Sequence, residues 1–253
     1  MMNVPCKVLD TRMSSNQRIN QHPAYILHSK PYRDTSLIVD ILTRSHGRIA
    51  AVAKGARQPK SKFNGILQPF TGLLVSWSGH SDLLTLTDAE AQGITLRLAG
   101  NKLMAGFYLN ELLLRLLQRH DPHEELFEAY HQTLTRLAVS TEDEVLLRQF
   151  EYYLLQEIGY GLILDHDVNT GEAVQSESHY CYYIEHGPVR IDTPAMEKNS
   201  LLLKGETLQA LASGQLSSAA MLKEAKYFMR AVISHHLGGK PLRSREMAKQ
   251  KVL

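Results

Sequence analysis

The segment that decides the fold runs from Ile41 to Ser81 and reads ILTRSHGRIAAVAKGARQPKSKFNGILQPFTGLLVSWSGHS. Two apolar runs in it, Arg48–Ala53 and Phe70–Trp77, have the length and composition of strands, and glycine and proline residues separate them. Further short runs of the same kind precede, overlap and follow the segment: Ala24–Leu27, Leu37–Leu42 and Leu83–Leu86. Short strands at roughly regular spacing with such punctuation predict a small β-barrel or sandwich.

The same segment contains no Asp or Glu, although it carries six basic residues. Cations without acidic neighbours on one side of a small barrel would attract phosphates and release the counterions condensed on a nucleic acid. The run from Gly55 to Lys62 reads as a flexible basic loop between strands, and such loops beside an oligonucleotide-binding (OB) barrel follow a phosphate backbone. The alternative is a solvated loop without a partner. The candidate DNA-binding cations are Arg44, Arg48, Lys54, Arg57, Lys60 and Lys62.

Base stacking would require an exposed aromatic side chain near these cations. Phe63 lies between Lys62 and Asn64, so we expect it to be exposed and assign it to the DNA-binding set. We expect Phe70 and Trp77 to lie in the core instead.

The bulk composition limits the class of protein. The chain has 253 residues, of which 43% are hydrophobic and 21% charged, and this suits a folded protein of one or two domains. The formal net charge of +2 is too small to indicate a partner by itself. Two cysteines, no signal-like start and no long apolar run favour a cytoplasmic protein without a membrane span.

The apolar period changes near residues 94–100, from the period of strands to that of helices. We therefore expect an α+β protein with a flexible lead-in at 1–21, a barrel domain at 22–97 and a mainly helical domain at 98–253. A capping box, Thr141 to Glu144, is expected to open the third helix. An irregular insert at 162–200 should contain a hairpin of Tyr180–Ile184 with Val189–Ile191.

The helical part contains two further candidate sites. Lys223, Lys226 and Arg230 are spaced to share one face of a helix, and we predict that they form a second DNA-binding surface. Arg148 follows Leu147 on an otherwise apolar helix, and an arginine beside an apolar groove suits a peptide that ends in a carboxylate. A structural ion pair between Arg148 and a glutamate of the bundle is the alternative.

The sequence offers no catalytic residues, no cofactor motif and no metal site. The phosphate-loop, dinucleotide and nucleophile-elbow motifs are absent. The chemically active side chains of the insert lack paired ligand spacing for zinc: His166, Asp167, His179, Cys181 and His186.

The order of several short motifs resembles one family. They are His28-Ser29-x-Pro31-x-x-Asp34-Thr35-Ser36-Leu37, Gly47-Arg48, Ala53-Lys54-Gly55-Ala56-Arg57, Leu67-Gln68-Pro69-Phe70, Tyr108–Leu112, Phe150-Glu151, Gly159-Tyr160-Gly161 and Gly238–Leu242 with Ser244-Arg245-Glu246. This combination resembles the bacterial recombination mediator RecO from about His22 to the end of the chain.

The resemblance implies an N-terminal OB domain followed by a helical domain. It also implies binding and annealing of single- and double-stranded DNA, in the cytoplasm at the nucleoid. Implied partners are RecR, RecF and RecA of the RecF pathway, together with the acidic C-terminal tail of single-stranded DNA-binding protein (SSB), for which Arg148 is the matching position. Many members carry a four-cysteine zinc module where this chain has Asp165–Gly171, so we infer that packing replaces zinc here.

Two other classes of function remain as alternatives. The chain could be an adaptor whose basic patches bind acidic proteins rather than DNA. A nuclease would need clustered carboxylates for Mg²⁺, and the sequence shows no such cluster.

Overall fold

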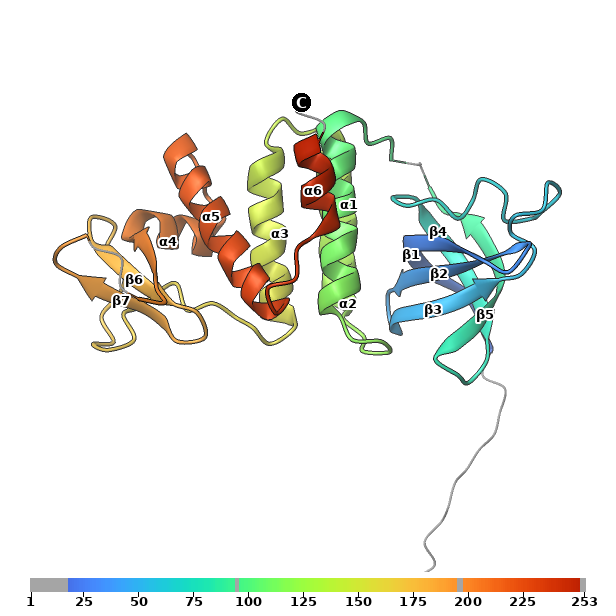
Figure 1. Cartoon of the computed structure of the whole chain (residues 1–253), viewed down its shortest axis with the longest axis horizontal. Helices are drawn as coiled ribbons and strands as arrows, with labels where there is room; N and C mark the ends of the chain where they lie inside the picture. The colour runs from blue at the N-terminus through green and yellow to red at the C-terminus, as the bar shows by residue number, and fades with distance from the viewer. Residues whose placement is uncertain (1–17, 94–95, 195–197, 251–253) are drawn as a thin grey trace, which may run out of the picture.

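The computed structural model describes residues 18–93, 96–194 and 198–250, with the side chains of 248–250 left aside. A β-barrel lies at one end of the molecule, a small sheet at the other, and helices lie between them (Figure 1). The α+β class and the order of barrel before helices agree with the sequence prediction.

Five strands close the barrel in the order β1-β2-β3-β5-β4. Strands β3 and β5 pair in parallel, and the other neighbours are antiparallel, which is the arrangement of an OB-type barrel. The strands are β1 (Arg18–Tyr32), β2 (Ser36–Thr43), β3 (Gly47–Ala53), β4 (Gly72–Ser78) and β5 (Leu83–Ala91). Strand β1 begins within the expected lead-in of 1–21, because Arg18 and Ile19 pair with the far end of β4. The rest of the lead-in, residues 1–17, lies outside the described residues.

The barrel core follows the alternation of the strands. Val39 and Ile41 from β2 meet Leu73 and Val75 from β4 inside it. The exposure predicted for Phe63 is wrong, because this side chain is only 5% exposed and belongs to the same core. The loop between β3 and β4 turns Phe63 inward and leaves Lys54, Arg57 and Lys60 exposed. Phe70 and Trp77 are buried, as predicted.

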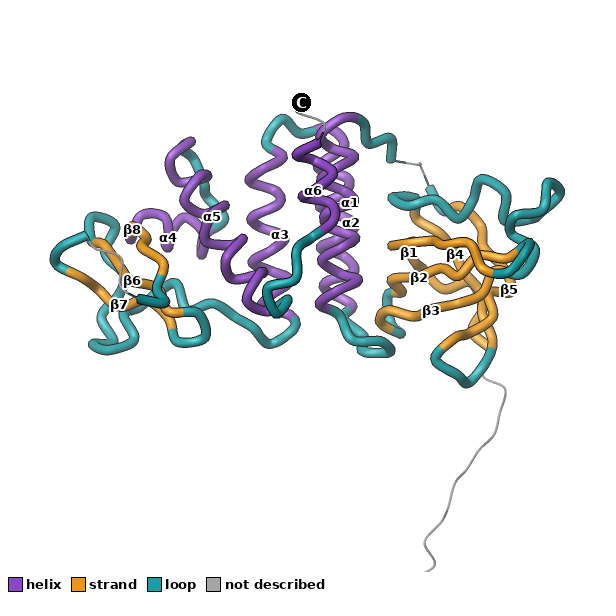
Figure 2. The backbone as a smooth tube through the Cα atoms, viewed as in Figure 1, coloured by secondary structure: helices purple, strands orange, loops and turns teal. Residues whose placement is uncertain are grey.

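Within the described residues six helices follow the barrel. They lie between the barrel and the small sheet (Figure 2). They are α1 (Gly100–Leu116), α2 (Glu124–Val139), α3 (Asp143–Glu157), α4 (Gly205–Ser213), α5 (Ala219–His236) and α6 (Arg243–Gln250). The capping box predicted for α3 is wrong. Its N-cap residue is Glu142, which makes no side-chain cap bond, and Ser140 Oγ accepts the Glu142 amide instead of a Thr141 cap.

The insert is more regular than the sequence suggested. The predicted hairpin is present as β6 (His179–Tyr183) and β7 (Gly187–Ile191), and β8 (Leu201–Lys204) completes a sheet of order β7-β6-β8.

The Asp167 carboxylate fastens the loop that precedes this sheet. It accepts the amides of Asn169 at 2.8 Å, Thr170 at 2.9 Å and Arg190 at 2.5 Å. Burial alone would raise the pKa of Asp167, but these N–H donors outweigh it and hold the pKa below its ordinary value. In the described part of the chain, no group of three or more His, Cys, Asp or Glu side chains is placed to hold a metal ion.

The barrel and the helices share one core. Four side chains project from the barrel and pack within the apolar cluster of the helical domain: Tyr25, Leu27, Leu42 and Phe70. Buried Asn110 of α1 donates to the Leu27 carbonyl at 2.9 Å, which fixes α1 against β1. The barrel therefore has a set orientation relative to the helices.

Candidate nucleic-acid interface

The basic loop, defined here as Lys54–Lys62, connects β3 to the segment before β4 and presents exposed cations. It is tied to the neighbouring turn between β1 and β2. The amide of Arg57 donates to the Thr35 carbonyl at 2.8 Å, and its guanidinium donates to the carbonyls of Arg33 and Asp34, each at 3.3 Å. The positive charge of Arg57 is thereby oriented but not neutralised.

The other lysines of the loop differ in their surroundings. Lys54 and Lys60 are exposed and make no ion pair with any described residue. Lys62 forms an ion pair with Asp88 at 3.1 Å and donates to the Thr87 carbonyl. Three unneutralised cations on a fixed loop, Lys54, Arg57 and Lys60, form the strongest candidate contact for a phosphate backbone.

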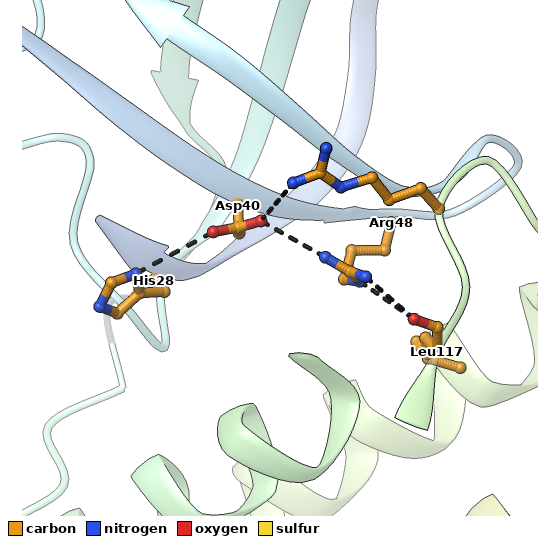
Figure 3. Close-up of polar contacts among 5 residues, drawn as sticks. His28, Asp40, Arg48 and Leu117 are labelled. Atoms are coloured by element: carbon orange, nitrogen blue, oxygen red, sulfur yellow. Dashed lines mark hydrogen bonds and ion pairs between the residues drawn. The ribbon is translucent and has the colours of Figure 1, made fainter. Parts of the chain in front are cut away.

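Arg48 does not belong to this surface. Its side chain is 13% exposed and forms an ion pair with Asp40 at 3.4 Å, while two of its N–H groups donate to the Leu117 carbonyl at 3.0 and 3.3 Å (Figure 3). The Asp40 carboxylate also faces Arg119 and His28, each at 4.0 Å. Unlike the exposed cation that the sequence prediction assumed, the Arg48 side chain is neutralised by Asp40 and joins the barrel to the end of α1.

Arg44 is also engaged across the domain junction. It lies 3.3 Å from the Glu128 carboxylate of α2, although both side chains stay about half exposed. The acids that neutralise the segment Ile41–Ser81 thus come from elsewhere: Asp40, Asp88 and Glu128. A count of acids along the sequence could not reveal them, because they approach only in the folded chain.

The second predicted cationic surface is divided by the structure. Lys223 and Arg230 of α5 are exposed and make no ion pair with the described residues. Lys226 points instead toward α3, where its ammonium group lies 2.6 Å from the Glu144 carboxylate. Two of the three predicted cations remain available on this helix.

A groove of about 1630 Å³ lies among α1, α3, α5 and the segment that leads into α6. Leu147, Leu216 and Leu222 contribute apolar surface to it. Its charged lining includes the acids Glu142, Asp143, Glu144 and Glu246 and the cations Arg136, Arg148, Lys226, Arg230 and Arg245. The sequence did not place Arg245 at this groove, because nothing in it indicated that the C-terminal segment returns to α1.

Arg148 lies at the bottom of this groove and is 3% exposed. It donates to Glu151 at 2.7 Å, so the predicted alternative of a structural ion pair is present. Tyr108 donates to the same Glu151 oxygen, and Arg245 donates to the Tyr108 hydroxyl at 2.9 Å. Burial raises the pKa of the Glu151 carboxyl, and Arg148 opposes this shift.

Glu151 does not satisfy the whole guanidinium. The Nε and Nη1 groups of Arg148 are buried without a hydrogen-bond partner among the described residues. A buried N–H group without an acceptor is unfavourable by about 1–3 kcal/mol, more when charged. Arg148 therefore braces the bundle through Glu151 and keeps two buried N–H groups without a partner among the described residues.

Along the described chain, no helix combines the length and apolarity needed to cross a bilayer. The structure is that of a two-part α+β protein, in which an OB-type barrel with a cationic loop is joined to a helical domain with a groove that Arg148 lines.

Comparison with known proteins gives the family. The family description "Recombination protein O N terminal" matches residues 17–94, and "Recombination protein O C terminal" matches residues 97–246. The chain belongs to the RecO family.

Curated relatives are similar in sequence to this protein over nearly its whole length. A protein named DNA repair protein RecO from Azoarcus sp. is 46% identical over 239 residues, which cover 94% of this chain and 98% of the relative. A relative of the same name from Nitrosospira multiformis is 47% identical over 234 residues, covering 92% and 96%. Another from Methylococcus capsulatus is 46% identical over 236 residues, covering 93% and 96%.

Proposed function

We propose that this protein is a DNA-binding recombination mediator in DNA repair that anneals complementary single strands and catalyses no bond-making step. The observation that carries the proposal is the fixed basic loop, where Lys54, Arg57 and Lys60 present unneutralised charge on an OB-type barrel. Membership of the RecO family supports the same function.

Annealing requires two negatively charged strands to approach each other. The basic loop neutralises phosphates of one strand and releases its counterions. Lys223 and Arg230 on α5 do the same for a second strand on the helical domain. Because the barrel is held in one orientation by the shared core, the two surfaces keep a constant separation, and repulsion between bound strands falls while their bases pair.

The groove provides the attachment to strands that are already coated. A peptide with apolar side chains and a terminal carboxylate, such as the acidic C-terminal tail of SSB, matches its chemistry. Leu147 and Leu222 contact the apolar side chains, and the two unpartnered donors of Arg148 bind the carboxylate.

Recruitment through this groove brings the protein to strands coated with SSB. There it acts with RecR, and with RecF where present, so that RecA replaces SSB in the RecF pathway. Such a protein works in the cytoplasm at the nucleoid. Family membership supports these partners.

The DNA proposal is tested by reversing charge on the basic loop. In fluorescence-anisotropy titrations at two salt concentrations, Lys54→Glu with Lys60→Glu should weaken binding to all sequences. It should also reduce the salt slope by about 1.4, at roughly 0.7 for each lost contact with single-stranded DNA. The matched control reverses Arg190 and Lys204, which are exposed in the small sheet at the far end of the molecule. Equal effects of both pairs would favour the alternative, an adaptor that prefers acidic proteins. An assay for annealing of complementary oligonucleotides should lose rate with the first pair only.

The groove proposal is tested with a peptide that carries the SSB tail sequence. Arg148→Ala should weaken peptide binding and leave DNA binding unchanged. Because that change leaves Glu151 buried without its cation, a second variant combines it with Glu151→Gln, which removes the uncompensated charge. Loss of peptide and DNA binding together in both variants would show that the bundle had unfolded and that Arg148 has only a structural role.

A further inference from the structure

The outer face of α5 carries an exposed tyrosine between two exposed cations. Tyr227 is 62% exposed, and Lys223 and Arg230 are exposed with it. The three residues are spaced by four and three positions, so they form one stripe about 10 Å long at 1.5 Å per residue.

The opposite face of α5 carries the packing of the helix. Ala225, Phe228 and Val232 are fully buried there. Lys226 turns toward Glu144 of α3, and Glu224 accepts a hydrogen bond from Thr207 of α4. The side chains that flank the stripe are thus engaged with neighbouring helices, whereas the stripe is exposed, with Arg230 at the rim of the groove.

Tyr227 also differs from the other exposed tyrosine. Tyr160 is 47% exposed, but its ring stacks on His236 at a centroid distance of 4.1 Å. The Tyr227 ring makes no ring contact and its hydroxyl no hydrogen bond with any described side chain. Neither packing nor hydrogen bonding within the described chain accounts for an aromatic residue at this position.

We propose that Tyr227 stacks on a base of single-stranded DNA while Lys223 and Arg230 bind the phosphates on either side of it. This inference rests on the proposed function. It assigns the stacking aromatic residue to the helical domain, because Phe63 on the barrel is buried. Lys223 and Arg230 lie about 10 Å apart along the helix, and their long side chains reach inward to the two phosphates that flank the base over the ring. A duplex offers no free base face at this surface, so the stripe selects single strands.

Stacking and charge make different contributions that can be measured separately. One base stacked on an aromatic side chain contributes about 1–3 kcal/mol, which corresponds to about 5- to 150-fold in affinity. Stacking releases no counterions, so it leaves the salt slope unchanged, whereas loss of one phosphate contact lowers the slope by about 0.7.

The test compares Tyr227→Ala, Tyr227→Phe and Lys223→Ala in titrations with single-stranded and duplex oligonucleotides. Tyr227→Ala should lose about 5- to 150-fold in single-strand affinity with an unchanged salt slope and unchanged duplex affinity. Tyr227→Phe should keep wild-type affinity, because its ring stacks equally well. Lys223→Ala should lower the salt slope. Tyr160→Ala, at the other exposed tyrosine, is the matched control and should bind both DNA forms normally.

A fluorescence measurement supplies the second readout. The sequence has one tryptophan, Trp77, which is buried in the barrel. A Tyr227→Trp variant should therefore show new emission that single-stranded DNA quenches and duplex DNA does not.

Three results would overturn the inference: unchanged single-strand binding by Tyr227→Ala, equal losses for single strands and duplexes, or absence of quenching. If the wild-type protein binds no DNA at all, the proposed function fails as well. If the basic-loop variants weaken binding and the Tyr227 variants do not, only the stacking assignment fails.

Discussion

Replacing Gly47 with alanine measures how firmly the barrel is held against the helices. Gly47 has φ of +65°, a left-handed conformation that favours glycine, at the turn between β2 and β3. A Cβ atom there would lie 2.2 Å from the carbonyl oxygen of Asp121 and 2.5 Å from its carbonyl carbon. Both are backbone atoms, so no side-chain rotation can relieve the contact. The loop between α1 and α2 would have to move.

The expected loss has two parts. Holding alanine in the left-handed conformation destabilises the fold by about 1–2 kcal/mol. Displacing the loop breaks the bond from the His120 amide to the Arg48 carbonyl and loosens the bonds from Arg48 to Leu117, at about 1 kcal/mol each. The total is about 3–4 kcal/mol. Gly65 is the matched control, because its φ is +73° and nothing lies within 4 Å of an added Cβ. Gly65→Ala should show only the first part.

Urea unfolding provides the assay. Trp77 fluorescence follows the barrel, and far-ultraviolet circular dichroism follows the helices. Gly47→Ala should lose about 2 kcal/mol more than Gly65→Ala, and its two transitions should separate. If the two variants have the same midpoint and coincident transitions, the junction is looser than the described contacts require and the reasoning is refuted.

Three further substitutions test other contacts. Phe63→Ala should lower the free energy of unfolding by about 3–5 kcal/mol, whereas a role in stacking alone would leave stability unchanged. Asp167→Asn should destabilise the protein by about 1–2 kcal/mol at neutral pH, measured by thermal unfolding. Since the folded pKa of Asp167 is lowered, the stability that its carboxylate contributes is present above the ordinary pKa and is lost as the pH falls through the folded pKa. The free energy of unfolding should therefore depend less on pH in the acid range in the variant than in the wild-type protein. Glu111→Ala removes the acceptor of the Arg243 and Ser244 amides, and hydrogen exchange in α6 should rise while exchange in α1 stays the same.

The parts of the fold that depend on local pattern could be predicted from the sequence. The apolar runs Leu37–Leu42 and Arg48–Ala53 were predicted as strands from their length and composition, and they are present as β2 and β3. Helix α6 was missed because its sequence is strongly polar and it is held from outside by Glu111 of α1. Strand β8 was missed for a related reason, since four residues become a strand only through pairing with β6.

The candidate site divides in the same way. Exposed cations in a turn-rich loop, such as Lys54 and Lys60, could be found because their surroundings are set by local sequence. Arg48 and Phe63 were misassigned, because their contacts depend on which distant segment covers them. Tyr227 gave no signal in sequence: its exposure depends on which face of α5 the neighbouring helices cover.

The shared core at the junction limits how this protein can be divided or recombined. The two family descriptions meet near residue 95, yet Tyr25, Leu27, Leu42 and Phe70 pack among the helices. A barrel expressed alone would expose these side chains to water and tend to aggregate. A chimaera that takes its barrel from a relative would have to take the α1–α2 loop from the same source, because Gly47 leaves no room for a mismatched backbone. The two domains can therefore be exchanged only as a pair, and substitutions on the two sides of this junction are expected to covary.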